Sequence, residues 1–138
     1  MESVHIPRKL INQILEQAQQ SPGKEICGLV SSRNSNNNQP VHCYPIANTS
    51  SEPNHRYTMD PKQQIDTFRI MRERDEELYA IYHSHPESPA SPSSEDLRQA
   101  SYPDALHIII SMSTKGTLQL RGFRLKADSA VAIDITAE

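Results

Sequence analysis

The chain has 138 residues, of which 36% are hydrophobic and 22% are charged, and its net charge is −3 at pH 7. These values predict one folded domain over residues 1–138, and they exclude a strongly basic nucleic-acid-binding surface and an apolar run of membrane-spanning length. Because the two cysteines suggest no disulfide framework and the first residues lack the apolar core of a secretory signal, we expect a cytoplasmic protein.

Helix and strand signals alternate in the first part of the chain. Residues 7–20 predict a helix, because Pro7 suits the first helical position and apolar residues recur on one face. A turn follows, and residues 25–30 then predict a short apolar strand. The Asn-rich residues 31–39 predict a mobile surface loop, and residues 41–46 predict a second strand.

A second helix is predicted after an irregular surface segment at residues 47–57. Asp60 and Pro61 are typical of a helix start, with Asp60 as the cap. The charged run at residues 72–77 is typical of a solvated face rather than a binding patch. The apolar side predicted for this helix consists of Ile65, Phe68 and Met71.

The next strand carries two histidines on one face. Residues 78–82 are apolar and predict a buried strand, which Pro86 ends because proline cannot donate to a strand ladder. His83 and His85 lie two residues apart on this extended chain, so both side chains leave the same face. At a rise of about 3.3 Å per residue their attachment points lie about 6–7 Å apart, which is close enough to bind one metal ion.

A bend and a short helix can return a carboxylate to these histidines. Residues 87–92 are rich in proline and serine, and Ser93 is suited to cap a helix predicted from Ser94 to about Ser101, with Asp96 in its first turn. A lone histidine at a strand end, or a lone Ser-x-x-acid motif, is usually structural. Together, two neutral nitrogens and one carboxylate form the ligand set of a catalytic zinc site, with a fourth position open to water. The sequence therefore predicts one zinc ion per chain.

Such a site also needs a general base. Bound zinc lowers the pKa of its water to about 7, and a nearby group must take the proton and pass it to the leaving amine. Glu25 is attractive because it begins a strand, but spacing alone does not choose among the nearby acids. The candidates are Glu25, Glu52, Glu87 and Glu95.

The remaining elements are strands. Residues 106–112 are almost continuously apolar and predict a central strand. Its one histidine, His107, lies at the start of the strand and is expected to be structural. In residues 117–125 the apolar positions change phase after Gly122, which predicts a bulge. Residues 131–135 predict a last short strand. The fold class is therefore mixed α/β, a central sheet flanked by helices, with the helix after Asp60 as a crossover connection.

Glu25, the pair His83-x-His85, then Ser93 after seven intervening residues and Asp96 after two more intervening residues resemble the JAMM (MPN+) metallopeptidase motif. The resemblance implies that zinc is bound by His83, His85 and Asp96. It also implies that Glu25 is the general acid/base holding the catalytic water, and that Ser93 hydrogen-bonds the oxyanion of the tetrahedral intermediate.

The likeness covers most of the chain, including residues 25–28 and 57–61. It implies the cytidine-deaminase-like MPN architecture, with a curved sheet. Members of this family hydrolyse peptide or isopeptide bonds, often after the Gly-Gly tail of ubiquitin or a ubiquitin-like protein. The chain resembles the short prokaryotic members, so the implied substrate is a ubiquitin-like sulfur-carrier protein carrying residues or a cysteine adduct beyond its terminal glycine.

Three other functions are compatible with parts of the sequence. Non-catalytic MPN-type scaffolds usually lack one or more ligands, whereas this chain has every residue of the motif. A metal hydrolase of small amides stays open. A cysteine protease using Cys27 would leave the histidine pair unexplained. The sequence leaves open the roles of Cys27 and His55 and the oligomeric state, for which a dimer is one option.

Overall fold

The computed structural model describes residues 2–98, 101–114, 116–126 and 128–138. Within these residues the strands are β1 (Ser3–Ile6), β2 (Cys27–Arg33), β3 (Gln39–Ile46), β4 (Glu76–His85), β5 (Leu106–Ser111), β6 (Gln119–Lys126) and β7 (Ser129–Ala137). The helices there are α1 (Arg8–Gln20), the 3-10 turn η1 (Asn34–Asn36), α2 (Pro61–Glu73) and α3 (Ser94–Arg98).

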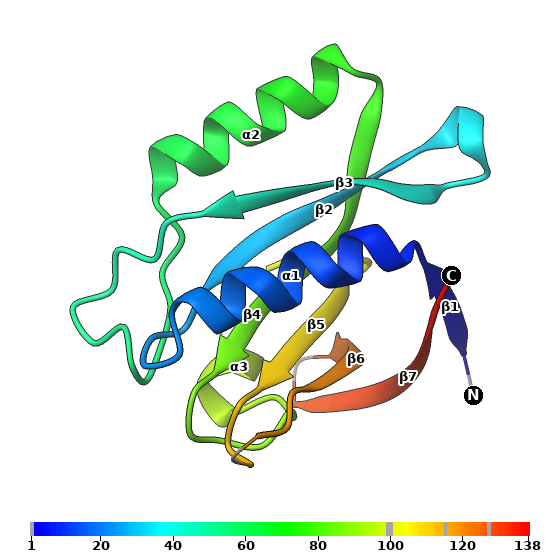
Figure 1. Ribbon diagram of the computed structural model, residues 1–138. Helices are drawn as coiled ribbons and strands as arrows, with labels where there is room; N and C mark the ends of the chain where they lie inside the picture. The colour runs from blue at the N-terminus through cyan, green and yellow to red at the C-terminus, as the bar shows by residue number, and fades with distance from the viewer. Residues whose placement is uncertain (1, 99–100, 115, 127) are drawn as a thin grey trace.

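The strands form one mixed sheet in the order β1-β7-β6-β5-β4-β2-β3 (Figure 1). The pairs β1–β7 and β4–β5 are parallel, and the other neighbours are antiparallel. Because β3 and β4 both run antiparallel to β2, they run in the same direction, and α2 is the crossover between them. The predicted mixed α/β sheet with flanking helices is therefore confirmed.

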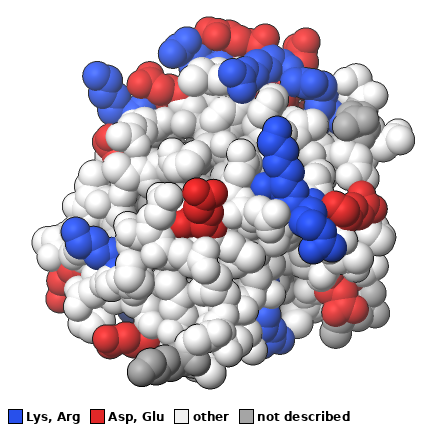
Figure 2. All heavy atoms as spheres, viewed as in Figure 1, with Lys and Arg blue, Asp and Glu red and all other residues white. Residues whose placement is uncertain are grey.

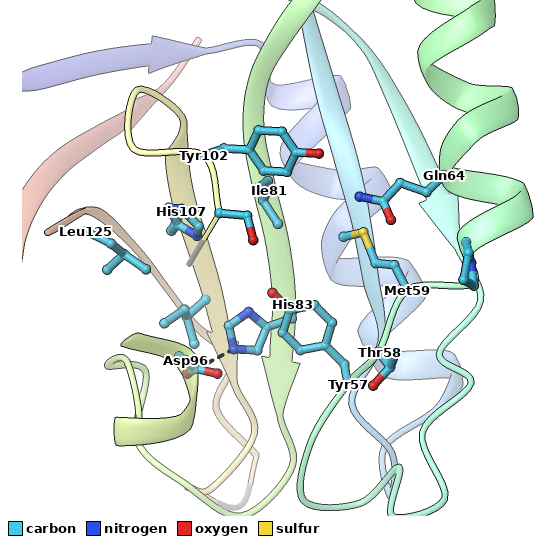
Figure 3. A pocket seen from close by; sticks show the side chains of 13 residues that line it. Tyr57, Thr58, Met59, Gln64, Ile81, His83, Asp96, Tyr102, His107 and Leu125 are labelled. Carbon is cyan, nitrogen blue, oxygen red and sulfur yellow. Dashed lines mark hydrogen bonds and ion pairs between the residues drawn. The ribbon is translucent and has the colours of Figure 1, made fainter. Parts of the chain in front are cut away.

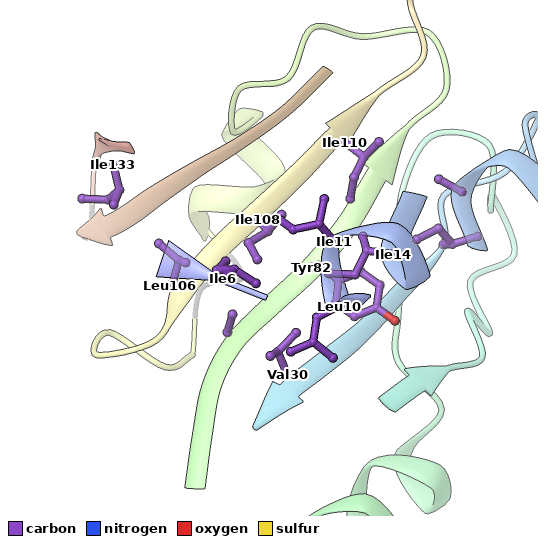
Figure 4. Close-up of a cluster of buried hydrophobic side chains, with 13 residues drawn as sticks. Ile6, Leu10, Ile11, Ile14, Val30, Tyr82, Leu106, Ile108, Ile110 and Ile133 are labelled. Carbon is purple, nitrogen blue, oxygen red and sulfur yellow. The ribbon is translucent and has the colours of Figure 1, made fainter. Parts of the chain in front are cut away.

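Helix α1 covers one face of the sheet and crosses in front of its central strands (Figure 1). The predicted apolar face of this helix is buried at Leu10, Ile11, Ile14 and Ala18. Tyr82 from β4 belongs to the same cluster (Figure 4). Helix α1 begins one residue later than predicted, with Pro7 in the capping position.

Helices α2 and α3 pack on the opposite face. Alternation along β4 and β5 places Ile81 and Ile109 on this face, against Met71 of α2 and Leu97 of α3 respectively. Because β5 is buried on both faces, its almost continuous apolar sequence fits its central place in the sheet.

The loop predicted at residues 31–39 is shorter than expected, because its first and last residues belong to strands and residues 34–38 form the turn of a hairpin. Strand β2 continues through buried Ser31 and Ser32, and β3 resumes at Gln39. Asn37 and Asn38 have φ values of 55° and 58°, a left-handed conformation that asparagine adopts more readily than most residues. The asparagines therefore supply the turn.

The bulge predicted at Gly122 is also wrong, because the β5–β6 register is regular from His107 to Ser111. Leu120 packs on the α1 side, whereas Phe123 packs on the α3 side. The phase change therefore reflects a strand with apolar side chains on both faces. A Cβ at Gly122 would lie 2.7 Å from the Ile135 side chain, which explains the glycine.

Helix α2 is capped as predicted, since the Asp60 side chain accepts a hydrogen bond from the Lys62 backbone at 3.3 Å. Met71 is buried, but Ile65 is 69% exposed, so its predicted burial is wrong. The prediction that the whole run 72–77 is solvated is also wrong, because Glu76 is buried.

Charged side chains of both signs gather over α2, at the top of Figure 2. Along the described part of the chain, no helix is both long and apolar enough to cross a bilayer.

Candidate metal centre

His83 and His85 lie side by side at the end of β4, where the sheet meets α3. Both are buried, at 2% and 4% exposure, and their Nε2 atoms are 3.1 Å apart. This arrangement is expected, because side chains two positions apart on a strand leave the same face. Burial also lowers the pKa of His83, which favours the neutral ring that a metal requires.

Asp96 returns to the histidines through the first turn of α3. Its Oδ2 lies 3.2 Å from Nε2 of His83 (Figure 3). The same oxygen lies 3.2 Å from Nε2 of His85. The backbone N–H of Ser93 donates to the same oxygen at 2.9 Å, and Ser93 Oγ accepts from the Asp96 backbone at 3.0 Å. This reciprocal capping pair orients the carboxylate. Burial opposes its charge, but its hydrogen bonds to the two histidines hold the pKa of Asp96 well below its usual range.

The three donor atoms form a nearly equilateral triangle with sides of 3.1–3.2 Å. Ligand atoms at zinc distances on a tetrahedral ion are spaced about 3.3–3.5 Å, so these residues fit zinc with little adjustment. In addition, His85 Nδ1 donates to the carbonyl of Pro89 at 2.8 Å, which orients the ring so that Nε2 faces the triangle. A zinc ion could therefore be held by His83, His85 and Asp96.

Glu25 is a buried carboxylate beside this triangle. It precedes β2, and its ligand oxygen lies within 4.8 Å of ring nitrogens of both histidines. Among the described residues, no group hydrogen-bonds to its buried Oε1. Burial raises the pKa of Glu25 to about 7, because the charged form loses its water. Such a carboxyl can take up and release a proton near neutral pH.

Either Asp96 or Glu25 could be the third metal ligand beside the two histidines. Asp96 contacts both histidine nitrogens directly at 3.2 Å and stays charged. Glu25 lies farther away and is half-protonated near pH 7. This division favours Asp96 as the ligand and Glu25 as the proton carrier.

The other candidate glutamates are engaged elsewhere. Glu52 pairs with Arg56 at 3.3 Å, Glu95 pairs with Arg98 at 2.7 Å, and Glu87 is exposed. Of the four acids that the sequence leaves open, the structure places Glu25 beside the histidines.

Ser84 is a site residue that sequence reasoning did not find. Its side chain leaves the face opposite to the histidines, where Oγ accepts from the Ile26 backbone at 2.9 Å and donates to the Lys24 carbonyl at 3.4 Å. The Ser84 backbone N–H also donates to the Ile26 carbonyl at 3.0 Å. These bonds fix the chain on both sides of Glu25. The partners lie about sixty positions apart in sequence, so no local pattern shows them.

The irregular residues 47–57 run along the site, as predicted, and also hold Glu25 in place. The Asn48 side-chain amide donates to the carbonyls of Glu25 and Arg56, both at 3.0 Å. The Glu25 backbone N–H donates to the Pro53 carbonyl at 2.7 Å. At the end of this segment the Tyr57 ring stacks on His83, with centroids 4.5 Å apart.

Cys27 and His55 take no part in the triangle. Cys27 is buried, and its thiol donates to the Ile46 carbonyl at 3.3 Å. Burial raises the pKa of Cys27 to about 12, which argues against a thiolate nucleophile. His55 is exposed and contacts Asn54.

Comparison with known proteins adds to this geometry. The family model described as prokaryotic homologs of the JAB domain matches residues 7–125. The CysO-cysteine peptidase of Mycobacterium tuberculosis is 30% identical over 122 residues, covering 88% of this chain and 82% of that protein. A desampylase of Haloferax volcanii is 28% identical over 102 residues, covering 74% of this chain and 73% of the relative.

The fold is also similar to solved structures. The crystal structure of a JAB1/MPN domain protein from Archaeoglobus fulgidus matches with a TM-score of 0.61 at 19% identity, covering 98% of this chain and 100% of that one. The MPN architecture that the sequence motif implies is therefore confirmed.

Proposed function

The chain belongs to the family of prokaryotic homologs of the JAB domain, and on this premise we propose that it is a zinc peptidase acting on ubiquitin-like sulfur-carrier proteins. It hydrolyses the amide bond that follows the carrier's C-terminal Gly-Gly. The observation that carries the proposal is the triangle of His83, His85 and Asp96 beside a buried carboxyl, Glu25, whose pKa is raised to about 7. The name of the mycobacterial relative, a CysO-cysteine peptidase, supports the substrate class.

Each residue of the motif has a separate task in this reaction. His83, His85 and Asp96 would hold zinc, which would supply activation of a water molecule and polarisation of the amide carbonyl. The carboxylate of Glu25 accepts a proton from the attacking water and then, as the carboxylic acid, gives it to the leaving nitrogen. Because Oε1 of Glu25 has no partner among the described residues, it is free to make these transfers.

Ser93 is proposed to stabilise the oxyanion of the tetrahedral intermediate. Its Oγ accepts one hydrogen bond, from the Asp96 backbone, so the hydroxyl proton remains able to donate. In this proposal the same serine caps α3 and donates a hydrogen bond to the oxyanion. A donor in this role contributes about 10²–10³-fold to turnover.

The test combines metal analysis with a cleavage assay. Wild type and Glu25→Gln are compared for zinc content and for hydrolysis of a ubiquitin-like carrier extended beyond its terminal Gly-Gly. Zinc near one per chain in both, with cleavage only by wild type, supports the proposal. Zinc without cleavage of any carrier would direct attention to a hydrolase of small amides. A folded protein that binds no added zinc would contradict the proposal and favour a non-catalytic scaffold.

A further inference from the structure

A pocket of about 410 Å³ opens directly beside the metal donors (Figure 3). His83 and Asp96 form its lower end in this view, and His107 and Tyr102 lie above them. Its volume is in the range of small-ligand sites. The apolar part of its wall consists of Met59, Pro61, Ile81, Ile109 and Leu125.

The pocket contains an unusual polar group, His107. It is 5% exposed on β5 next to Ile81 of β4, and its imidazole hydrogen-bonds to the backbone of Tyr102. No described group pairs with Nε2, the other ring nitrogen. Burial lowers the pKa of His107 to about 4, so the ring is neutral at pH 7. Since Nδ1 carries the proton in the bond to Tyr102, Nε2 is a buried acceptor that lacks a donor.

Apart from the proposed metal site at its end, the wall of the pocket offers no free charged side chain to pair with an occupant. Asp96 is its acidic residue, and it is already engaged with both histidines. The other lining side chains carry no charge at neutral pH. An occupant that satisfies this wall is uncharged, mostly apolar, and carries a hydrogen-bond donor.

The chemistry of the proposed reaction restricts which part of a substrate can enter. A Gly-Gly segment has no side chains and cannot fill an apolar pocket. The side chain nearest to the cleaved bond therefore belongs to the residue on its leaving side. This step rests on the proposed function.

We propose that this pocket binds the side chain of the leaving residue, and that His107 Nε2 accepts a hydrogen bond from a hydroxyl or thiol on it. His107 is then a specificity residue, not a structural one. It contacts the substrate beyond the cleaved bond and takes no part in proton transfer.

The test uses carriers that end in Gly-Gly and are extended by one amidated residue. Matched pairs differ only in the donor: tyrosine against phenylalanine, and serine or cysteine against alanine. The expected result is faster cleavage of the donor-bearing member, by about fivefold, which is the effect of one net hydrogen bond. Extensions with glutamate or lysine should be cleaved most slowly.

Two variants test the hydrogen-bond acceptor and the size of the pocket separately. His107→Phe keeps an aromatic ring and should abolish the preference for donor-bearing residues while zinc content stays the same. Gln64→Trp, on the α2 side of the pocket, should reduce cleavage of large leaving residues more than that of alanine. Arg69→Trp, on the same helix and outside the pocket lining, is the matched control and should change neither ratio.

Equal rates within every pair, or a preference that survives in His107→Phe, would overturn the proposal. Rates set by the residue preceding Gly-Gly would also overturn it, because the pocket would then serve the carrier side. If no carrier is cleaved, the proposed function fails, and the pocket is tested by binding instead. N-Acetyltyrosinamide, which is uncharged, should shift the His107 ring signals in NMR spectra of wild type and should bind His107→Phe more weakly; no shift would overturn the assignment.

Discussion

Two buried glutamates lie at opposite ends of the antiparallel pair β2–β4, and their surroundings differ. Glu76 pairs in register with Arg33, at the end of β2, whereas Glu25 lies just before Cys27, the residue paired with His83. Both are 6% exposed. Equal burial thus occurs in two different chemical settings.

The Glu76 carboxylate is saturated with donors. The groups that surround it are Ser31 Oγ at 2.7 Å, Arg33 Nη2 at 3.1 Å, His42 Nδ1 at 2.6 Å and Tyr44 OH at 2.6 Å. Burial alone would raise its pKa, but these hydrogen bonds outweigh that effect and lower the pKa of Glu76. A charge held this way ties β2, β3 and β4 together.

Around Glu25 the hydrogen bonds go to the backbone instead. Pro53, Asn48 and Ser84 fix the chain at and around this residue, while its Oε1 has no partner among the described residues. The fold therefore fixes the position of the carboxyl and leaves its oxygen for chemistry. A buried polar group left unpaired in this way indicates function more strongly than burial does.

The largest expected effect concerns which acid binds the metal. Asp96→Ala should lose zinc and reduce cleavage by more than the roughly 10²–10⁴-fold expected for a general base, because it removes a ligand. Zinc content by elemental analysis and the carrier assay measure both. If Asp96→Ala keeps stoichiometric zinc while Glu25→Ala loses it, Glu25 is a metal ligand. Glu25 would then differ from Glu76 by binding the metal and not by carrying a proton.

Glu25→Gln should give the next largest effect. The amide keeps the shape of the side chain but cannot carry the proton, so turnover should fall by about 10²–10⁴-fold while zinc is retained. Thermal unfolding should be unchanged or slightly raised, since no hydrogen bond to Oε1 is lost. Glu87→Gln, at an exposed position, is the control. Normal turnover in Glu25→Gln would refute its role as the base.

Glu76→Gln should show the reverse pattern. Losing the charge that four donors share should lower the free energy of unfolding by about 2–3 kcal/mol, measured in urea. Turnover of the folded variant should match wild type, because Glu76 lies at the far end of the strand pair. Its neighbour Glu77 is exposed, so Glu77→Gln should change stability by less than about 0.5 kcal/mol. Equal losses in the two variants would contradict the structural role.

The two glutamates should also respond to pH with opposite signs in zinc-free protein. The pKa of Glu25 is raised from 4.5 to about 7, so its contribution to stability is present at low pH and is lost as pH rises through that range. The pKa of Glu76 is lowered, so its contribution is present above 4.5 and is lost as pH falls.

Unfolding in urea at several pH values, for wild type and the two glutamine variants, checks these signs. Relative to Glu25→Gln, wild type should lose on the order of 2 kcal/mol between pH 5 and pH 7.5. Relative to Glu76→Gln, wild type should lose stability on acidification below pH 5. Parallel profiles for the two variants would show that the glutamates are electrostatically alike.

The sequence predicted what local chemistry determines. The cap at Asp60, the two histidines on one strand face and the return of Asp96 all depend on residues close together in the chain. Strand β1 was not predicted, because it is short and is stabilised by pairing with β7 at the other end of the sequence. The burial of Glu76 was not predicted, because its donors come from two other strands.

The same limit applies to the site itself. The sequence motif includes Glu25, but the contacts that position this residue come from segments distant in the sequence. Ser84, between the two histidines, is the clearest example: its own side chain points to the opposite face and bonds the Lys24–Ile26 segment.

Ser84→Ala gives the smallest expected effect and tests this support directly. Without the hydroxyl, the segment carrying Glu25 loses two hydrogen bonds but keeps those from Pro53 and Asn48. Turnover should fall about three- to tenfold with zinc content and KM unchanged, because one net hydrogen bond contributes about 1 kcal/mol. A general packing defect would instead lower the free energy of unfolding and would reduce turnover equally whether or not Glu25 is present. The two explanations separate in the Glu25→Gln background: if Ser84 acts through Glu25, adding Ser84→Ala there should cost no further turnover, whereas an additive loss would show that Ser84 acts on the site by another route.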